Sequence, residues 1–135
     1  MDRVRFLTHK GKQILLVDYT GCTRQTLLDI LKEREQLSLA QPKGSVLLLV
    51  DVTGAQFTKD TVEEIKKVAV RERDRVKRAA IVGVETIPKV FVDSVSTFSV
   101  REYHAFATRE DALNWLAQEE APAAKQDKKK EILPG

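Results

Sequence analysis

Two short polar segments of the sequence repeat one pattern, each at the end of an apolar run. Residues 18–21 read Asp-Tyr-Thr-Gly and residues 51–54 read Asp-Val-Thr-Gly. If the preceding strands run parallel, both loops lie at the carboxyl edge of one sheet, where open α/β sheets usually bind ligands. The alternative is that Asp, Thr and Gly only end strands and begin helices here, as they commonly do. The candidate binding residues at this edge are Asp18, Tyr19, Thr20, Asp51, Thr53 and Thr86.

Other residues that often carry chemistry are few. The sequence has no G-x-G-x-x-G, phosphate-loop or G-x-S-x-G motif. His9 and His104 lack the short spacing of a metal-binding pair, so we expect surface or packing roles for them. Cys22 lies near an expected helix start, where its pKa could be lowered and its thiol reactive; the alternative is a small structural residue. We therefore predict no catalytic residue, no cofactor and no metal site, and we expect a protein that is not an enzyme.

Length and composition indicate one domain. A chain of 135 residues can bury a core without disulfides or metals. No apolar run approaches the roughly 20 residues that cross a bilayer, so we expect no membrane span. The N-terminus lacks the apolar core of a signal peptide, and a single cysteine suits a reducing compartment. The predicted location is cytoplasmic.

The net charge of +3 does not indicate a nucleic-acid partner. Four lysines and two acids in 121–135 leave a net charge of +1 on residues 1–120. A nearly neutral folded part lacks the basic surface that binds nucleic acid. We expect residues 1–120 to form a single domain and residues 121–135 to be a disordered basic tail, because the tail is poor in bulky apolar residues.

The apolar runs predict an α/β domain organised around residues 45–70. Residues 46–50 are continuously apolar, which is typical of a strand covered on both faces, and a helix from about 58 to 78 follows. Residues 4–8 and 13–18 predict a hairpin that joins the sheet through its second strand. Further strands are expected at 79–84 and 102–106, and further helices at about 23–39 and 108–120. The charged residues 71–78 are expected to form a solvated face, with a patch that binds an acidic partner or an anion as the alternative.

The segment 86–98 has two interpretations. Thr86 followed by Pro88 is a good helix start, whereas the abundance of Val and Phe favours a strand. As a helix, the segment completes the order β-β-α-β-α-β-α-β-α, a mixed sheet with an antiparallel edge hairpin and about four helices. The apolar residues on one face of that helix are Ile87, Phe91, Val95 and Phe98.

Two stretches of the sequence resemble the STAS/SpoIIAA-like family. They are VLLLVDVTGAQFTKDTVEEI in the middle of the chain and FATREDALNWL near its end, and the resemblance spans roughly residues 4–118. The family is related in fold to bacterial anti-sigma-factor antagonists and, more distantly, to CRAL-TRIO lipid-binding domains. The resemblance implies a SpoIIAA-like fold without naming a chemistry.

The resemblance also points to one modification site. The antagonists carry an Asp-Ser-Ser-Gly loop, whose second serine is phosphorylated, at the start of the helix after the central strand. The matching residues here are Lys59, Asp60, Thr61 and Val62. Thr61 is therefore the candidate phosphosite, with an ordinary role at the helix N-terminus as the alternative. Lys59 and Val62 depart from the pattern, so we expect the phosphorylation switch to be absent.

Three function classes follow from the resemblance. The first is a non-catalytic regulatory or protein-interaction module that presents the surface around residues 53–73 to a protein partner or a second copy. The second is a binder of a hydrophobic small molecule or lipid, in a groove lined by Ile87, Phe91, Val95 and Phe98. An enzyme comes third, because no nucleophile with a base is evident.

Overall fold

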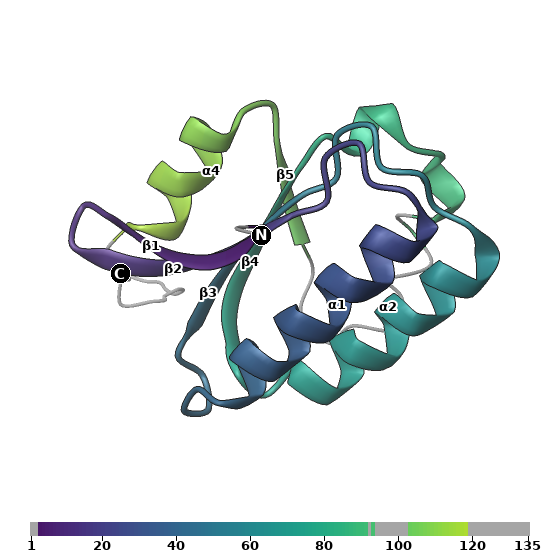
Figure 1. Cartoon of the computed structure of the whole chain (residues 1–135). Coiled ribbons are helices and arrows are strands. Elements are labelled where there is room, and N and C mark those ends of the chain that lie inside the picture. Colours follow the sequence, from purple (N-terminus) through teal and green to yellow (C-terminus); the bar gives the residue numbers. More distant parts are fainter. Residues whose placement is uncertain (1–2, 92, 94–102, 119–135) are drawn as a thin grey trace.

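The computed structural model describes residues 3–91, 93 and 103–118. It shows a five-stranded sheet with helices on both faces (Figure 1). The strands are β1 (Val4–His9), β2 (Lys12–Asp18), β3 (Val46–Asp51), β4 (Val76–Val82) and β5 (Tyr103–Phe106). The helices are α1 (Arg24–Leu39), α2 (Lys59–Glu72) and α4 (Arg109–Leu116), with a 3-10 turn η1 (Val84–Thr86). Residues 89–91 and 93 are also helical.

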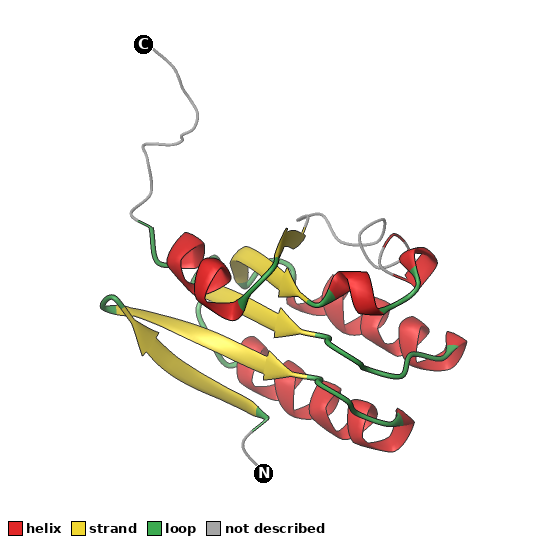
Figure 2. Cartoon of the chain, turned by 90° about the horizontal axis from the view of Figure 1, so that it is seen from above, coloured by secondary structure: helices red, strands yellow, loops and turns green. Residues whose placement is uncertain are grey.

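The strands lie in the order β1-β2-β3-β4-β5. β1 is antiparallel to β2, and the remaining neighbours are parallel, as Figure 2 shows for the strands beside the hairpin. The predicted edge hairpin and its attachment through the second strand are confirmed. β3 lies at the centre of the sheet, and all six of its residues are buried, as its continuous apolar run predicts.

Side-chain alternation along the central strands divides the interior into two cores. Val46, Leu48 and Val50 of β3 face the core beneath α1 and α2, whereas Leu47 and Leu49 face the core beneath α4. Successive side chains of a strand point to opposite faces, so one apolar strand supplies both cores. Figure 1 shows α1 and α2 side by side on one face and α4 on the other.

The second helix ends earlier than the sequence predicts. α2 stops at Glu72, and the Arg75 amide donates to the Glu72 carbonyl at 2.8 Å. Val76 fits the helical spacing of the preceding apolar residues, but it pairs with Val46 in the sheet. Strand pairing suits a β-branched residue better than a helix terminus does, so β4 begins three residues before the predicted start.

The charged segment 71–78 is only partly a solvated face, which corrects the prediction. Glu72 is 1% exposed. Arg75 Nη1 donates to the carbonyls of Leu39 and Gln41, at 3.1 and 2.6 Å. Arg78 Nη2 donates to the Leu116 carbonyl at the end of α4, at 2.9 Å. These arginines bind carbonyls that the helix ends leave without intrahelical partners.

Some predictions fall outside the described residues. The helical residues 89–91 and 93 agree with the helix interpretation of the segment 86–98, but Val95 and Phe98 are outside the described part, as is the predicted tail at 121–135. α4 ends at Leu116, earlier than the predicted end near 120. Within the described ranges, no helix has the length and apolar character needed to cross a bilayer.

Candidate functional site

The two Asp-x-Thr-Gly loops lie side by side at the carboxyl edge of the sheet. Asp18 and Asp51 are register partners on the parallel strands β2 and β3. The backbone continues this alignment into the loops, because the Tyr19 amide donates to the Asp51 carbonyl at 2.8 Å and the Gly21 amide to the Thr53 carbonyl at 2.9 Å. The structure therefore brings the two loops together as the repeated pattern predicts.

Each aspartate binds within its own loop. Asp18 Oδ1 accepts from the Thr20 amide at 2.9 Å and from the Thr20 hydroxyl at 2.6 Å. Asp51 Oδ1 accepts from the Thr53 amide at 3.1 Å and from the Thr53 hydroxyl at 2.7 Å. Hydrogen bonds from an aspartate to the backbone two residues on stabilise the turn itself.

Thr86 joins the same edge from η1. Its hydroxyl donates to the Gly83 carbonyl at 2.7 Å and accepts from the Gly54 amide at 3.0 Å. Gly83 has φ +93°, and a Cβ there would lie 2.6 Å from the Thr53 amide nitrogen. Only glycine allows this close approach in that conformation. We call this assembly the rim; it consists of Asp18, Thr20, Asp51, Thr53 and Thr86.

Arg109, the first residue of α4, pairs with both rim aspartates. Its Nε donates to Asp51 Oδ2 at 2.7 Å, and its Nη2 lies 3.4 Å from Asp18 Oδ1. Burial raises the pKa of Asp18, but the hydrogen bonds from Thr20 and the charges of Arg109 and Arg3 outweigh burial, so the pKa lies below its ordinary value. The rim carboxylates thus already have a cation and internal donors, which leaves little of their charge for a ligand.

Tyr19 departs from the predicted rim, because its side chain turns into the core beneath α1 and α2. It is 1% exposed, and its hydroxyl accepts from Arg34 Nη1 at 3.3 Å. Burial raises the pKa of Tyr19 to about 12. The prediction that Tyr19 lies at the rim is therefore wrong. In a loop that follows a strand, side-chain alternation places the residue after Asp18 on the other side.

Arg34 lies at the centre of a buried polar cluster that spans four elements. Its Nε donates to Glu72 Oε1 at 3.0 Å, its Nη2 forms an ion pair with the same carboxylate, and Nη2 also donates to the Tyr103 hydroxyl at 2.7 Å. The Ser38 hydroxyl donates to Glu72 Oε2 at 2.7 Å. We call Tyr19, Arg34, Ser38, Glu72 and Tyr103 the buried network.

A cavity of about 50 Å³ lies against the buried network. Three network residues, Tyr19, Arg34 and Tyr103, line it together with eight apolar side chains. Among these eight are Val50 of β3, Val62 and Ile65 of α2, and Ile87 and Phe91 at the start of the segment 86–98. Two of the four predicted groove residues, Ile87 and Phe91, thus face this cavity.

Comparison with known proteins agrees with this fold. The family model described as SpoIIAA-like matches residues 11–117. The chain belongs to the SpoIIAA-like family. A crystal structure of an uncharacterised protein from the DUF3478 family with a SpoIIAA-like fold, from Shewanella loihica PV-4, superposes with a TM-score of 0.63 at 18% identity, over 84% of this chain and 91% of that one. No match was found among curated proteins.

The candidate phosphosite of this SpoIIAA-like chain is part of a helix cap. Thr58 is the N-cap of α2, and its amide donates to the Thr61 hydroxyl at 2.9 Å, while the Thr61 hydroxyl donates to the Thr58 carbonyl at 3.0 Å. The Thr58 hydroxyl in turn accepts from the Thr61 amide, so the two threonines form a capping box. Thr61 is fully buried, so a kinase would reach its hydroxyl only after the first turn of α2 opens; the absence of the phosphorylation switch stays a prediction.

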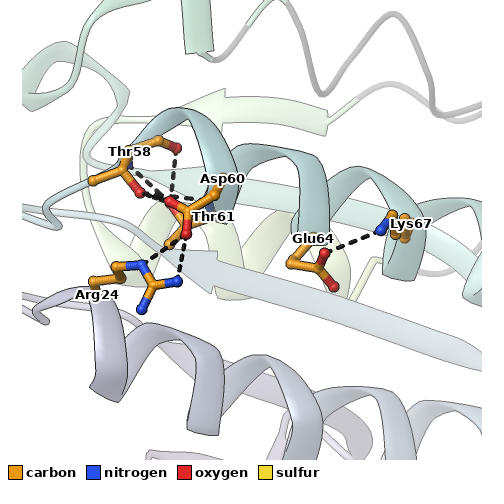
Figure 3. Close-up of polar contacts among 6 residues, drawn as sticks. All are labelled: Arg24, Thr58, Asp60, Thr61, Glu64 and Lys67. Carbon is orange, nitrogen blue, oxygen red and sulfur yellow. Dashed lines mark hydrogen bonds and ion pairs between the residues drawn. The ribbon is translucent and has the colours of Figure 1, made fainter.

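Two ion pairs lie on the exposed surface beside this cap, as Figure 3 shows. Arg24 at the start of α1 donates to Asp60 Oδ2 at 2.7 Å, and Lys67 lies 3.1 Å from Glu64. The hydrogen bond from Arg24 is the main cause that lowers the pKa of Asp60 to about 2. Both pairs are largely solvent-exposed and are worth little stability individually.

Cys22 and the histidines have structural surroundings. Cys22 is 2% exposed and its pKa is raised by burial, which favours the small structural residue over the reactive thiol. His9, the last residue of β1, is hydrogen-bonded to Asn114 of α4 at 2.8 Å. The ring of His104 lies 4.5 Å from that of Trp115. Within 3–91, 93 and 103–118, no group of three or more His, Cys, Asp or Glu residues could hold a metal ion.

Arg34 and Glu72 of the buried network and Arg109 at the rim were not identified from the sequence. Arg34 lies at the inward helical spacing set by Leu27 and Leu31, and Glu72 lies at the inward spacing of α2. Two opposite charges on the inward faces of consecutive helices are a signal that could have predicted their pairing. Arg109 offered no such signal, because its partners are 58 and 91 positions away in the chain.

Proposed function

We propose that this protein is a non-catalytic SpoIIAA-like domain that binds an apolar small molecule. The observation that carries the proposal is the cavity, which coincides with the groove predicted from the sequence at Ile87 and Phe91. Protein interiors are packed as densely as organic crystals, so a partly open space among apolar side chains suits a ligand. The polar residues of the cavity lining are close together, because Arg34 is hydrogen-bonded to both Tyr19 and Tyr103.

The size of the cavity limits the ligand. A space of about 50 Å³ holds about four water-sized groups, at roughly 10–15 Å³ for each. The enclosed part therefore suits about four non-hydrogen atoms, and because the cavity is partly open, it suits one end of a small ring compound or of a longer apolar molecule such as a lipid chain. A whole lipid does not fit the cavity as it stands.

The rim supports the non-catalytic part of the proposal. Asp18 and Asp51 are bound by their own threonines and by Arg109. General acid–base catalysis needs a carboxyl group that exchanges a proton with a substrate near the working pH. A carboxylate with a lowered pKa, such as that of Asp18, does not meet this need.

The regulatory or protein-interaction role predicted from the resemblance has less support. Over the residues that the structure describes, the large apolar side chains that are exposed are Val70, at 39%, and Val90, at 67%. Single exposed apolar residues are common on monomeric proteins and do not mark an interface. Binding of a protein partner or of a second copy therefore remains a prediction, and a ligand in the cavity is the function that the geometry favours.

Two matched substitutions in α2 test the proposal. Val62 and Val68 are both buried, at 4% and 3% exposure, but Val62 lines the cavity and Val68 does not. Val68→Phe should lower the free energy of unfolding by about 1–3 kcal/mol through overpacking, whereas Val62→Phe should cost less because its ring enters the cavity. Urea denaturation measures both.

The same pair of variants tests binding. NMR titration of the wild type with benzene or xenon should shift the methyl signals of cavity residues such as Ile65 and Ile87, and Val62→Phe should abolish these shifts. Val68→Phe is the control, and its cavity signals should still move. Absence of shifts in the wild type at millimolar probe concentrations would contradict the proposed function.

A further inference from the structure

The buried network leaves two hydroxyl protons without a described acceptor. Tyr19 and Tyr103 both accept hydrogen bonds from Arg34 through their oxygens. A tyrosine hydroxyl can also donate one hydrogen bond, and no residue of the described part accepts from either hydroxyl. A buried donor that lacks an acceptor is costly. Tyr19 is fully buried and Tyr103 is half-buried, so the Tyr19 proton above all calls for an acceptor.

The hydrogen bonds that the structure describes for the other network members do not involve either tyrosine proton. Glu72 is the only carboxylate in the network, and its donors are Arg34 at Oε1 and Ser38 at Oε2. Arg34 is a donor at every nitrogen. Since Tyr19 and Tyr103 both line the cavity, their hydroxyls are placed to donate to an acceptor on a molecule inside it.

The charges around the cavity decide which acceptor suits it. Arg34 and Glu72 form an ion pair with 2% exposure of each side chain, so the network carries no net charge. Burial raises the pKa of both tyrosines, which therefore stay protonated and keep their protons for donation at neutral pH. An anion would lose its hydration here without gaining an uncompensated cation, and such a burial is costly. A neutral oxygen meets the donors without this cost.

We propose that the cavity selects a neutral, mainly apolar molecule with one acceptor oxygen at its end, such as a ketone, aldehyde or ester, and that the hydroxyls of Tyr19 and Tyr103 donate to that oxygen. Arg34 is a positioning residue, because it holds both tyrosine oxygens and so turns their protons away from itself. The apolar part of the ligand lies among Val50, Ile65, Ile81 and Ile87. This inference rests on the proposed function, to which it adds the chemical class of the ligand.

Two ring compounds of nearly equal size test the inference in the wild-type protein. Cyclopentanone carries one carbonyl oxygen, and cyclopentane has none. NMR titration should show that cyclopentanone binds about five-fold more tightly, as expected for one net hydrogen bond of about 1 kcal/mol. Both tyrosines of the chain belong to the network, and its one tryptophan, Trp115, packs in the opposite core. Tyrosine ring signals should therefore move while the Trp115 indole signal stays in place.

Removing the hydroxyls separates selectivity from cavity shape. Tyr19→Phe should reduce the preference for cyclopentanone, and Tyr19→Phe with Tyr103→Phe should bring the affinity ratio to about one while cyclopentane still binds. Circular dichroism confirms that the variants fold, and the wild-type ratio tests the inference even if they do not.

The outcomes separate a failure of the tyrosine inference from a failure of the proposed function. If both compounds bind the wild type with equal affinity in the cavity, the tyrosine inference is overturned and the apolar binding function stands. An affinity ratio unchanged in the double variant overturns it in the same way. If neither compound binds, or if only the Trp115 signal moves, the proposed function fails and the inference fails with it.

Discussion

The rim and the buried network differ in how far their hydrogen-bonding groups are paired within the protein. At the rim, each aspartate accepts from its own threonine and forms an ion pair with Arg109. In the buried network, Arg34 and Ser38 donate to Glu72, while the hydroxyls of Tyr19 and Tyr103 accept from Arg34 and line the cavity. The rim residues, which the sequence pattern marks as candidates for chemistry, thus bind mainly one another and Arg109. The two tyrosines of the buried network can still donate to a ligand.

The largest effect should come from breaking the buried network. Arg34→Ala leaves the buried Glu72 carboxylate without its cation, which should lower the free energy of unfolding by about 3–5 kcal/mol. Urea denaturation measures the loss. As a control, Arg34→Met combined with Glu72→Leu removes both charges and should recover most of the stability. A cost of less than about 1 kcal/mol for Arg34→Ala would show that the pair does not hold α1 to α2.

Breaking the rim should have a smaller effect. Arg109→Ala should cost about 1–2 kcal/mol at pH 7, because Arg109 makes a charge-assisted hydrogen bond to Asp51, whose side chain is 7% exposed, but is itself 37% exposed. Thermal or urea unfolding gives the value. Arg109→Lys keeps the charge and loses the planar fork, so it should lie between the wild type and Arg109→Ala.

The rim effect should also depend on pH. The pKa of Asp18 is lowered in the folded protein, so Asp18 contributes stability above its unfolded pKa of about 3.9, and this contribution is lost as the pH falls through the folded value. Part of that contribution comes from the charge of Arg109. The stability difference between the wild type and Arg109→Ala should therefore shrink when the pH is lowered from about 5 to about 2; a difference that stays constant over this range would argue against the ion pair.

The smallest effect on stability is expected at the exposed pair of Arg24 and Asp60. Arg24→Ala should leave the unfolding transition nearly unchanged, because an exposed pair contributes little. It should nevertheless raise the pKa of Asp60 from about 2 toward its ordinary value, since the Arg24 hydrogen bond is the main cause of the shift. NMR titration of the Asp60 carboxyl signal measures this pKa, and an unchanged value would mean that the hydrogen bond is absent in solution.

The parts of the fold that were predictable are those set by neighbouring residues. The apolar run 46–50 predicts the central strand, and the repeated Asp-x-Thr-Gly pattern predicts two adjacent loops because parallel strands align their ends. The end of α2 was not predictable in this way, because Val76 satisfies both a helical and a strand pattern until its pairing with Val46 decides between them.

The site was less predictable than the fold. Helical spacing predicts that Ile87 and Phe91 share an apolar face, the resemblance to lipid-binding domains predicts a groove there, and both residues line the cavity. Arg34 and Glu72 are 38 positions apart and meet only because α1 and α2 pack together, while Tyr103 comes from the far edge of the sheet. Such contacts depend on how the elements pack, which local patterns do not encode.

Titrating the wild-type protein with cyclopentanone, and following the shifts residue by residue by NMR, tests the contrast between the two regions most directly. The account predicts shifts in the signals of Tyr19, Tyr103, Ile87 and Phe91, with those of Thr20, Thr53 and Arg109 unmoved. Shifts confined to the rim residues, with the cavity signals unchanged, would contradict it.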